Sequence, residues 1–99
     1  MDRSELVVLA KEIHEGILDK IEIGESFLFT FCSGETNLCM SFTPENINVS
    51  TDMYEISDGN DSLIHIKNNE VTHIEKEEEI DGILYSINFK NGTQMIIML

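Results

Sequence analysis

The clearest structural signal in this chain lies between Ile83 and Leu99, where the sequence reads ILYSINFKNGTQMIIML. Large apolar side chains recur at every second position over 83–89, which is the period of a strand with one buried face. Asn91 and Gly92 follow, and an Asn-Gly pair between apolar runs favours a tight hairpin. We therefore expect antiparallel strands over about 83–89 and 93–99, with a positive φ at one or both turn residues.

The same two-residue period recurs towards the start of the chain. Phe27, Phe29 and Phe31 give the first strand one aromatic face, and Pro44, the only proline, ends the strand that returns from it. Later runs rich in Ile, Val and Tyr lie between turn signals. The strands expected before residue 83 cover about 27–32, 38–43, 47–51, 53–57, 63–67 and 71–77.

An amphipathic helix is expected over about 3–21, before the strands begin. Asp2 and Glu5 have the spacing of a capping box at its start, and Gly24 follows its end. Spacings of three and four residues place one apolar stripe along the helix. The stripe consists of Leu6, Leu9, Ala10, Ile13 and Ile17, and Ile21 would extend it.

These elements predict one α+β domain over residues 1–99, in which the helix packs on a twisted antiparallel sheet of six to seven short strands. So many short strands leave free edges, and partial closure toward a barrel is therefore an alternative. The final strand is apolar on both sides because of Ile96 and Met98. It is expected to be either central in the sheet or covered by a partner.

The sequence contains no signal that predicts secretion or membrane insertion. Met1 to Glu5 is too acidic and polar for the start of a secretory leader. The apolar run from Leu6 to Ala10 is much shorter than the roughly twenty residues of a membrane span. We expect a cytoplasmic protein with free thiols at Cys32 and Cys39, although a hairpin closing at Glu35-Thr36 would place these cysteines opposite each other.

Charge is the dominant global property of the chain. Its 99 residues include 19 Asp and Glu against 6 Lys and Arg, a formal net charge of −13. Charge of one sign at this density repels itself and weakens the compact state. It also argues against direct nucleic-acid binding, because duplex binding depends on Lys and Arg contacts that release counterions.

The densest negative charge is Glu75-Lys76-Glu77-Glu78-Glu79-Ile80-Asp81, which we call the acidic run. In an extended strand every second side chain shares a face, so four acids would form a row while Lys76 and Glu78 point away. A row of carboxylates fits a basic groove on a partner protein. The alternative is a solvated edge strand whose charges prevent aggregation. The candidate partner-binding residues are Glu75, Glu77, Glu78, Glu79 and Asp81.

No catalytic or cofactor-binding motif accompanies the acidic run, and we expect neither enzyme activity nor a cofactor. Nucleophilic catalysis needs Ser or Cys beside a base, and the sequence pattern brings no such pair together. We also expect no metal site. The weak candidates are His65 and His73, which a three-residue turn after Lys67 would make cross-strand neighbours on the same face as Glu75.

The leading interpretation is a non-enzymatic acidic protein that occupies a basic surface of a partner protein. Small size, strong acidity and absent catalytic motifs resemble the small inhibitors that phages and mobile elements direct against nucleic-acid-processing enzymes, such as anti-CRISPR proteins and other nucleic-acid mimics. The alternatives are a small metal- or ligand-binding domain and a self-associating structural or assembly module. In that module Gln94 to Leu99 would pair with the same segment of a second copy in a homodimer.

Overall fold

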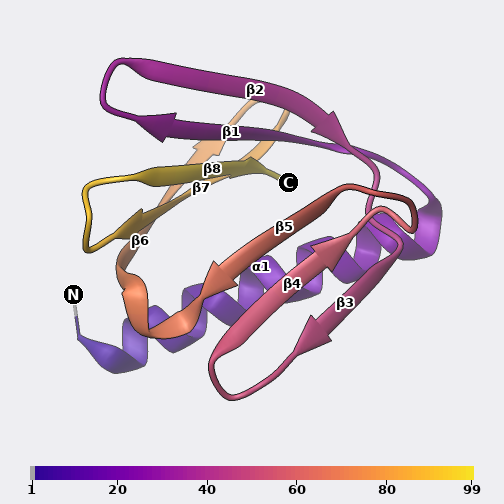
Figure 1. Ribbon diagram of the computed structural model, residues 1–99. Coiled ribbons are helices and arrows are strands. Elements are labelled where there is room, and N and C mark those ends of the chain that lie inside the picture. The colour runs from indigo at the N-terminus through magenta and orange to yellow at the C-terminus, as the bar shows by residue number, and fades with distance from the viewer. Residues whose placement is uncertain (1) are drawn as a thin grey trace.

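The computed structural model describes residues 2–99 and contains one α-helix followed by eight strands (Figure 1). The strands form one five-stranded and one three-stranded antiparallel sheet, which confirms the predicted α+β class. Within the described residues the sheets do not close into a barrel, because β2 and β6 remain edges. The elements are α1 Arg3–Ile23, β1 Phe27–Ser33, β2 Thr36–Phe42, β3 Asn46–Val49, β4 Met53–Ser57, β5 Leu63–Lys67, the 3-10 turn η1 Asn68–Glu70, β6 Val71–Glu79, β7 Gly82–Phe89 and β8 Gln94–Met98.

The helix begins at the predicted cap and ends slightly later than expected. The Asp2 carboxylate accepts a hydrogen bond from the Glu5 amide at 2.9 Å. Gly24 ends the helix with a left-handed φ of 72°, a conformation that glycine adopts without a steric penalty. The apolar stripe faces the core, where Ile13 and Ile17 are buried. Leu6, Leu9 and Ile21 are partly buried against the same core, whereas Ala10 is exposed.

The five-stranded sheet has the order β2-β1-β8-β7-β6. β8 therefore lies between β1 and β7, which confirms that the doubly apolar final strand is central in the sheet. Both backbone edges of β8 are paired, so edge-to-edge pairing of Gln94 to Leu99 with a second copy is contradicted. A homodimer formed by any other surface stays a prediction.

The β7–β8 hairpin has the predicted antiparallel pairing, with Leu84 opposite Met98. Gly92 carries the positive φ, 87°, and Asn91 does not. The Gly92 amide donates to the Phe89 carbonyl at 3.1 Å, so the loop is a three-residue turn with glycine in the left-handed position. The prediction of a positive φ at one or both turn residues is thus confirmed at Gly92.

The β1–β2 hairpin turns at Gly34-Glu35, because Ser33 lies opposite Thr36. Gly34 has a φ of 60°, which suits the first position of such a two-residue turn. This register does not place Cys32 opposite Cys39, so the arrangement that assumed a turn at Glu35-Thr36 is wrong. Both cysteines are free.

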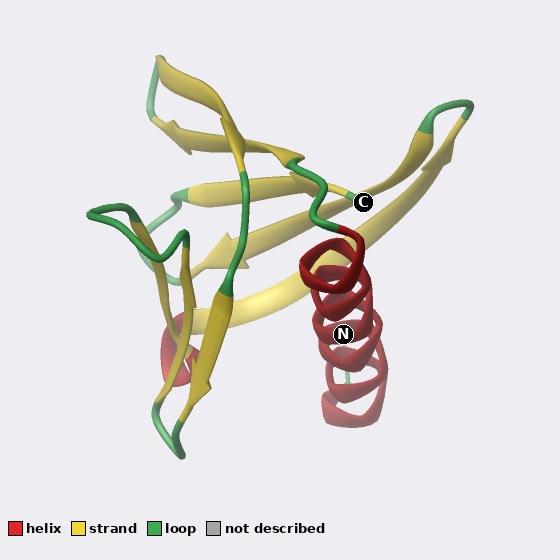
Figure 2. Ribbon diagram, turned by 90° about the vertical axis from the view of Figure 1, so that its right-hand side faces the viewer, coloured by secondary structure: helices red, strands yellow, loops and turns green. Residues whose placement is uncertain are grey.

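One hydrophobic core joins the helix and both sheets. Figure 2 shows α1 and the three-stranded sheet against the same face of the five-stranded sheet. We call this the inner face, and the opposite one the outer face. The core residues are Ile13, Ile17, Phe27, Phe29, Phe42, Ile56, Ile64, Ile66, Ile74, Tyr85, Ile87 and Ile97. Within residues 2–99, no helix is both long enough and apolar enough to cross a bilayer.

Candidate functional site

The acidic run lies mainly on β6, an edge strand of the five-stranded sheet. β6 pairs only with β7, so its other backbone edge has no strand partner within residues 2–99. The acidic side chains of β6 are all exposed; they are Glu75, Glu77, Glu78 and Glu79. The structure therefore places these four candidate residues together on one solvent-exposed strand.

Asp81 does not continue the row on β6. Glu79 pairs with Gly82, so the chain reverses at Ile80 and Asp81. The expectation of one extended face from Glu75 to Asp81 is therefore wrong at its last member. Asp81 is nevertheless exposed, and it places a further carboxylate at the tip of the β6–β7 hairpin.

Lys76, the only cation of the acidic run, points to the inner face. Its Nζ donates to the Glu12 Oε1 atom of α1 at 2.7 Å, and the Tyr85 hydroxyl donates to the same oxygen at 3.0 Å. The hydrogen bond from Lys76 lowers the pKa of the Glu12 carboxyl, and the same bond raises the pKa of Lys76. Lys76 is thus engaged by the helix and does not neutralise the acids of the outer face.

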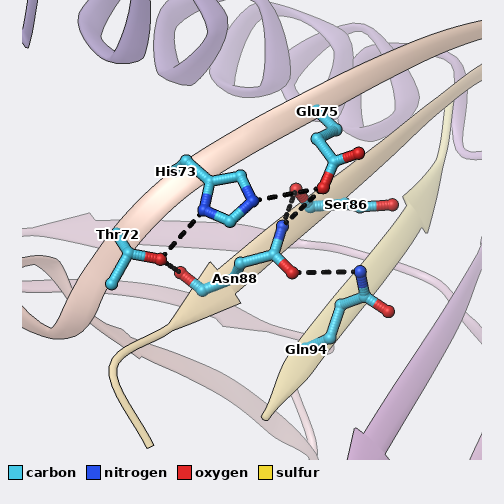
Figure 3. Close-up of polar contacts among 6 residues, drawn as sticks. All are labelled: Thr72, His73, Glu75, Ser86, Asn88 and Gln94. Atoms are coloured by element: carbon cyan, nitrogen blue, oxygen red, sulfur yellow. Dashed lines mark hydrogen bonds and ion pairs between the residues drawn. The ribbon is translucent and has the colours of Figure 1, made fainter. Parts of the chain in front are cut away.

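Glu75 belongs to a polar network on the outer face (Figure 3). Its Oε1 accepts from Asn88 Nδ2 at 3.3 Å and lies 3.2 Å from His73 Nε2. The Asn88 side-chain oxygen in turn accepts from Gln94 Nε2 at 3.1 Å. Thr72 Oγ1 donates to the Asn88 carbonyl at 3.1 Å and lies 3.0 Å from His73 Nδ1.

Both ring nitrogens of His73 take part in this network: Nδ1 faces the Thr72 hydroxyl and Nε2 faces the Glu75 carboxylate. An ionised carboxylate only accepts hydrogen bonds, so His73 Nε2 is the donor to Glu75. The ring therefore links the start of β6 to the first carboxylate of the acidic run.

The other acids of the hairpin take part in none of the ion pairs found within residues 2–99. The ion pairs of the described chain involve the carboxylates of Glu12, Glu25, Glu55 and Glu75. Across residues 2–99, therefore, Glu77, Glu78, Glu79 and Asp81 have no cationic partner within salt-bridge distance. The uncompensated negative charge is concentrated at the distal end of the β6–β7 hairpin.

The two weak metal candidates lie in different sheets. His65 is on β5 of the three-stranded sheet, whereas His73 is on β6 of the five-stranded sheet. Their predicted cross-strand juxtaposition is wrong because Asn68–Glu70 leads the chain from one sheet into the other. His65 Nδ1 instead lies 3.2 Å from Glu55 Oε2. Among the described residues, no three His, Cys, Asp or Glu side chains gather in a metal-binding arrangement.

His14 makes a contact that the sequence pattern did not indicate. Its Nδ1 lies 2.8 Å from the Tyr54 hydroxyl, and the two rings meet edge to face at 5.7 Å between centroids. Burial raises the pKa of Tyr54 to about 12. The pair joins α1 to β4 and so links the helix to the three-stranded sheet.

An apolar cavity of about 240 Å³ lies between the first half of α1 and both sheets. Its lining includes Leu6, Val7, Tyr54, Ile66 and Ile74. Arg3 and Asn68 are polar residues in the same lining. Pockets with an apolar lining and few polar groups are typical of small-molecule sites.

The fold and this geometry define a small acidic α+β protein with an anionic edge hairpin. Comparison with known protein families, with curated proteins and with solved structures finds no match to this chain. The candidate site consists of the exposed carboxylates of β6 and of Asp81 at the hairpin tip. Lys76 lies on the opposite face of the strand, where it contacts Glu12.

Proposed function

We propose that this protein is a non-enzymatic binding protein whose β6–β7 hairpin occupies a basic surface of a partner protein. The observation that carries the proposal is the uncompensated charge of Glu77, Glu78, Glu79 and Asp81 on an exposed hairpin. The hairpin extends beyond its neighbour, because β6 pairs with β7 as far as Gly82 whereas β8 pairs with β7 only from Leu84. Figure 2 shows this tip projecting at the upper right.

The shape and charge of the hairpin favour a groove as its complement. Side chains on one face of a strand repeat at about 6.6 Å, so Glu75, Glu77 and Glu79 form a regular linear array on the outer face, while Glu78 lies on the alternate face of the same strand. Complementary charges of this kind steer association and raise its rate by roughly 10- to 1000-fold. A groove that binds a nucleic-acid backbone has the matching cations. The protein would then act in the cytoplasm as a nucleic-acid mimic, comparable to the anti-CRISPR class of phage or bacterial inhibitors.

The competing explanation is that the acids only guard an edge strand against pairing with other chains. The variant Glu77→Gln/Glu78→Gln/Glu79→Gln separates the two, because none of these side chains takes part in the Glu75 network. Its matched control replaces three exposed acids of α1 as Glu15→Gln/Asp19→Asn/Glu22→Gln, with the same change of net charge.

The experiment measures association of each variant with a panel of purified, immobilised nucleic-acid-processing enzymes at low and high salt. We expect the hairpin variant to lose association rate at low salt, where screening is weakest, while the helix control keeps most of it. Equal binding by the two variants, together with new aggregation of the hairpin variant at high protein concentration, would support the edge-guard explanation instead.

A small-ligand-binding domain is the second candidate function, and the apolar cavity beside α1 favours it. Ala10 lines that cavity and lies on the helix surface, so Ala10→Phe would reduce its volume without removing a buried side chain. A small apolar compound that raises the melting temperature of the wild type, but not of this variant, would support the ligand-binding function.

A further inference from the structure

We propose that the outer face of the five-stranded sheet forms the second half of the contact surface, and that the partner presents an apolar patch bordered by Lys and Arg side chains. This inference rests on the proposed function, because it assumes that the β6–β7 hairpin docks on a basic surface. The contact surface then has an apolar centre in addition to its charged border.

The register of the sheet brings the apolar side chains of the outer face into one patch. Leu84 on β7, Met98 on β8 and Leu28 on β1 are successive cross-strand neighbours. Ile96 is the next outward side chain on β8, beside Met98. We call these four residues the outer apolar patch. Directly opposed side chains in a sheet have Cβ atoms about 5 Å apart, so the patch is continuous.

Nothing within the described chain covers this patch. The helix and the three-stranded sheet pack on the inner face, through residues such as Ile97 and Phe29 that alternate with the patch residues. Leu28 keeps 53% of its surface exposed, although it lies on an interior strand of the sheet. An antiparallel sheet with one solvated face normally carries polar side chains there. Clustered apolar side chains at such positions indicate an interaction surface.

The borders of the patch indicate the chemistry of its partner. Glu77 lies opposite Leu84 and Glu75 lies opposite Ser86, so the β6 side of the patch is acidic. On the other side the patch ends at the uncharged Thr30 and Ser41. The face is therefore complementary to an apolar surface flanked by cations. In such contacts the charged border mainly sets the association rate, and the desolvated centre sets the dissociation rate.

The same charges argue against a second copy of this chain as the occupant. Two copies packed through their outer faces would bring their Glu75 and Glu77 side chains near one another. Each copy also carries a net charge of −13. Like charges at an interface oppose association, whereas a basic partner gains from both the border and the patch.

The test uses the full ¹⁵N-labelled chain and two synthetic twelve-residue probes of equal charge, one alternating leucine with lysine and the other alternating serine with lysine. We expect the leucine probe to bind at least tenfold more tightly. Its largest amide shift changes should fall on outer-face residues such as Thr30, Ser86 and Ile96. The variant Leu28→Thr, which keeps a residue suited to strands, should bring the leucine probe to the affinity of the serine probe. Val49→Thr, at a 63% exposed position of the other sheet, is its control.

The outcomes separate this inference from the proposed function. If Glu77→Gln/Glu78→Gln/Glu79→Gln weakens both probes and Leu28→Thr changes neither, the acidic hairpin binds cations but the apolar half is overturned. If Leu28→Thr converts a dimer into a monomer in light scattering, a second copy occupies the face and the inference is overturned. If the hairpin variant binds both probes as tightly as the wild type, the proposed function fails, and with it the basic border of the partner.

Discussion

Lys76 of β6 and Glu12 of α1 form an ion pair with 2.7 Å between Nζ and Oε1, and this pair holds the acidic edge strand to the helix. Two features of Lys76 matter here. It gives Glu12 a cationic partner at the boundary of the core, and it lies on the face of β6 opposite to Glu75 and Glu77. Both follow from the alternation of side chains along a strand.

Replacing Lys76 by Gln should lower the melting temperature at pH 7 and have less effect in acid. The folded-state pKa of Glu12 lies below its ordinary value of 4.5, chiefly because Lys76 donates to it. The stabilisation is therefore fully present above about pH 4.5 and is lost as the pH falls through the folded-state pKa. Lys67→Gln is the control, because Lys67 is exposed and has no ion pair with residues 2–99. Equal losses for both variants at pH 7 would contradict the role of the pair.

Replacing Ile13 by Ala should destabilise the protein by about 2–5 kcal/mol, as deletions of buried aliphatic side chains do. Ile13 is 4% exposed and joins α1 to the core. Urea unfolding measures the loss, and Val8→Ala, at a 56% exposed position of the same helix, should change stability by less than about 0.5 kcal/mol. An unchanged unfolding midpoint for Ile13→Ala would show that the helix stripe does not stabilise the core.

The two tyrosines should ionise only above pH 10, their ordinary value. Burial raises the pKa of Tyr54 to about 12, and burial together with the hydrogen bond to Glu12 raises that of Tyr85. Between pH 10 and the folded-state values the unfolded chain loses these protons while the folded chain keeps them, so stability should fall as pH rises. Ultraviolet titration of the wild type and of Tyr54→Phe measures both steps. Half-ionisation of Tyr54 at pH 10 would contradict its burial against His14.

The hairpin variant Glu77→Gln/Glu78→Gln/Glu79→Gln should be at least as stable as the wild type. It removes three neighbouring like charges without breaking an ion pair in the described chain, so it reduces self-repulsion. Any gain in melting temperature at low salt should shrink in about 1 M salt, where the Debye length is roughly 3 Å. A lower melting temperature at both salt concentrations would show that these carboxylates stabilise the fold.

The elements of the fold could be predicted because their signals are local. The apolar stripe of the helix and the alternation in β7 need only neighbouring residues to be recognised. The division into two sheets could not be predicted in this way, because it depends on whether Asn68–Glu70 returns the chain as a hairpin or leads it across the core. The pairing of β1 with β8 joins distant parts of the sequence and leaves no local signal.

The candidate site likewise has some features with a local sequence signal and others that depend on distant residues. The exposure of the acidic strand was predictable, since several adjacent carboxylates cannot be buried without partners. The position of Asp81 was missed because the turn comes directly after Glu79. The Lys76–Glu12 pair was also missed, because 64 residues separate its members. Ile96 and Met98 were noted as apolar, but only the sheet register shows that they meet Leu28 and Leu84.

The central position of β8 also affects how the chain reaches its folded state. The β1–β2 hairpin and the β6–β7–β8 meander each involve nearby residues, and they are joined only by the pairing of β1 with β8. Closing so long a loop is slow compared with forming a hairpin. Until it closes, β1 and β8 both present unpaired backbone edges to other chains. Chains with a net charge of −13 repel one another, so we expect the acidity that weakens the finished structure to limit association of chains that still expose these edges.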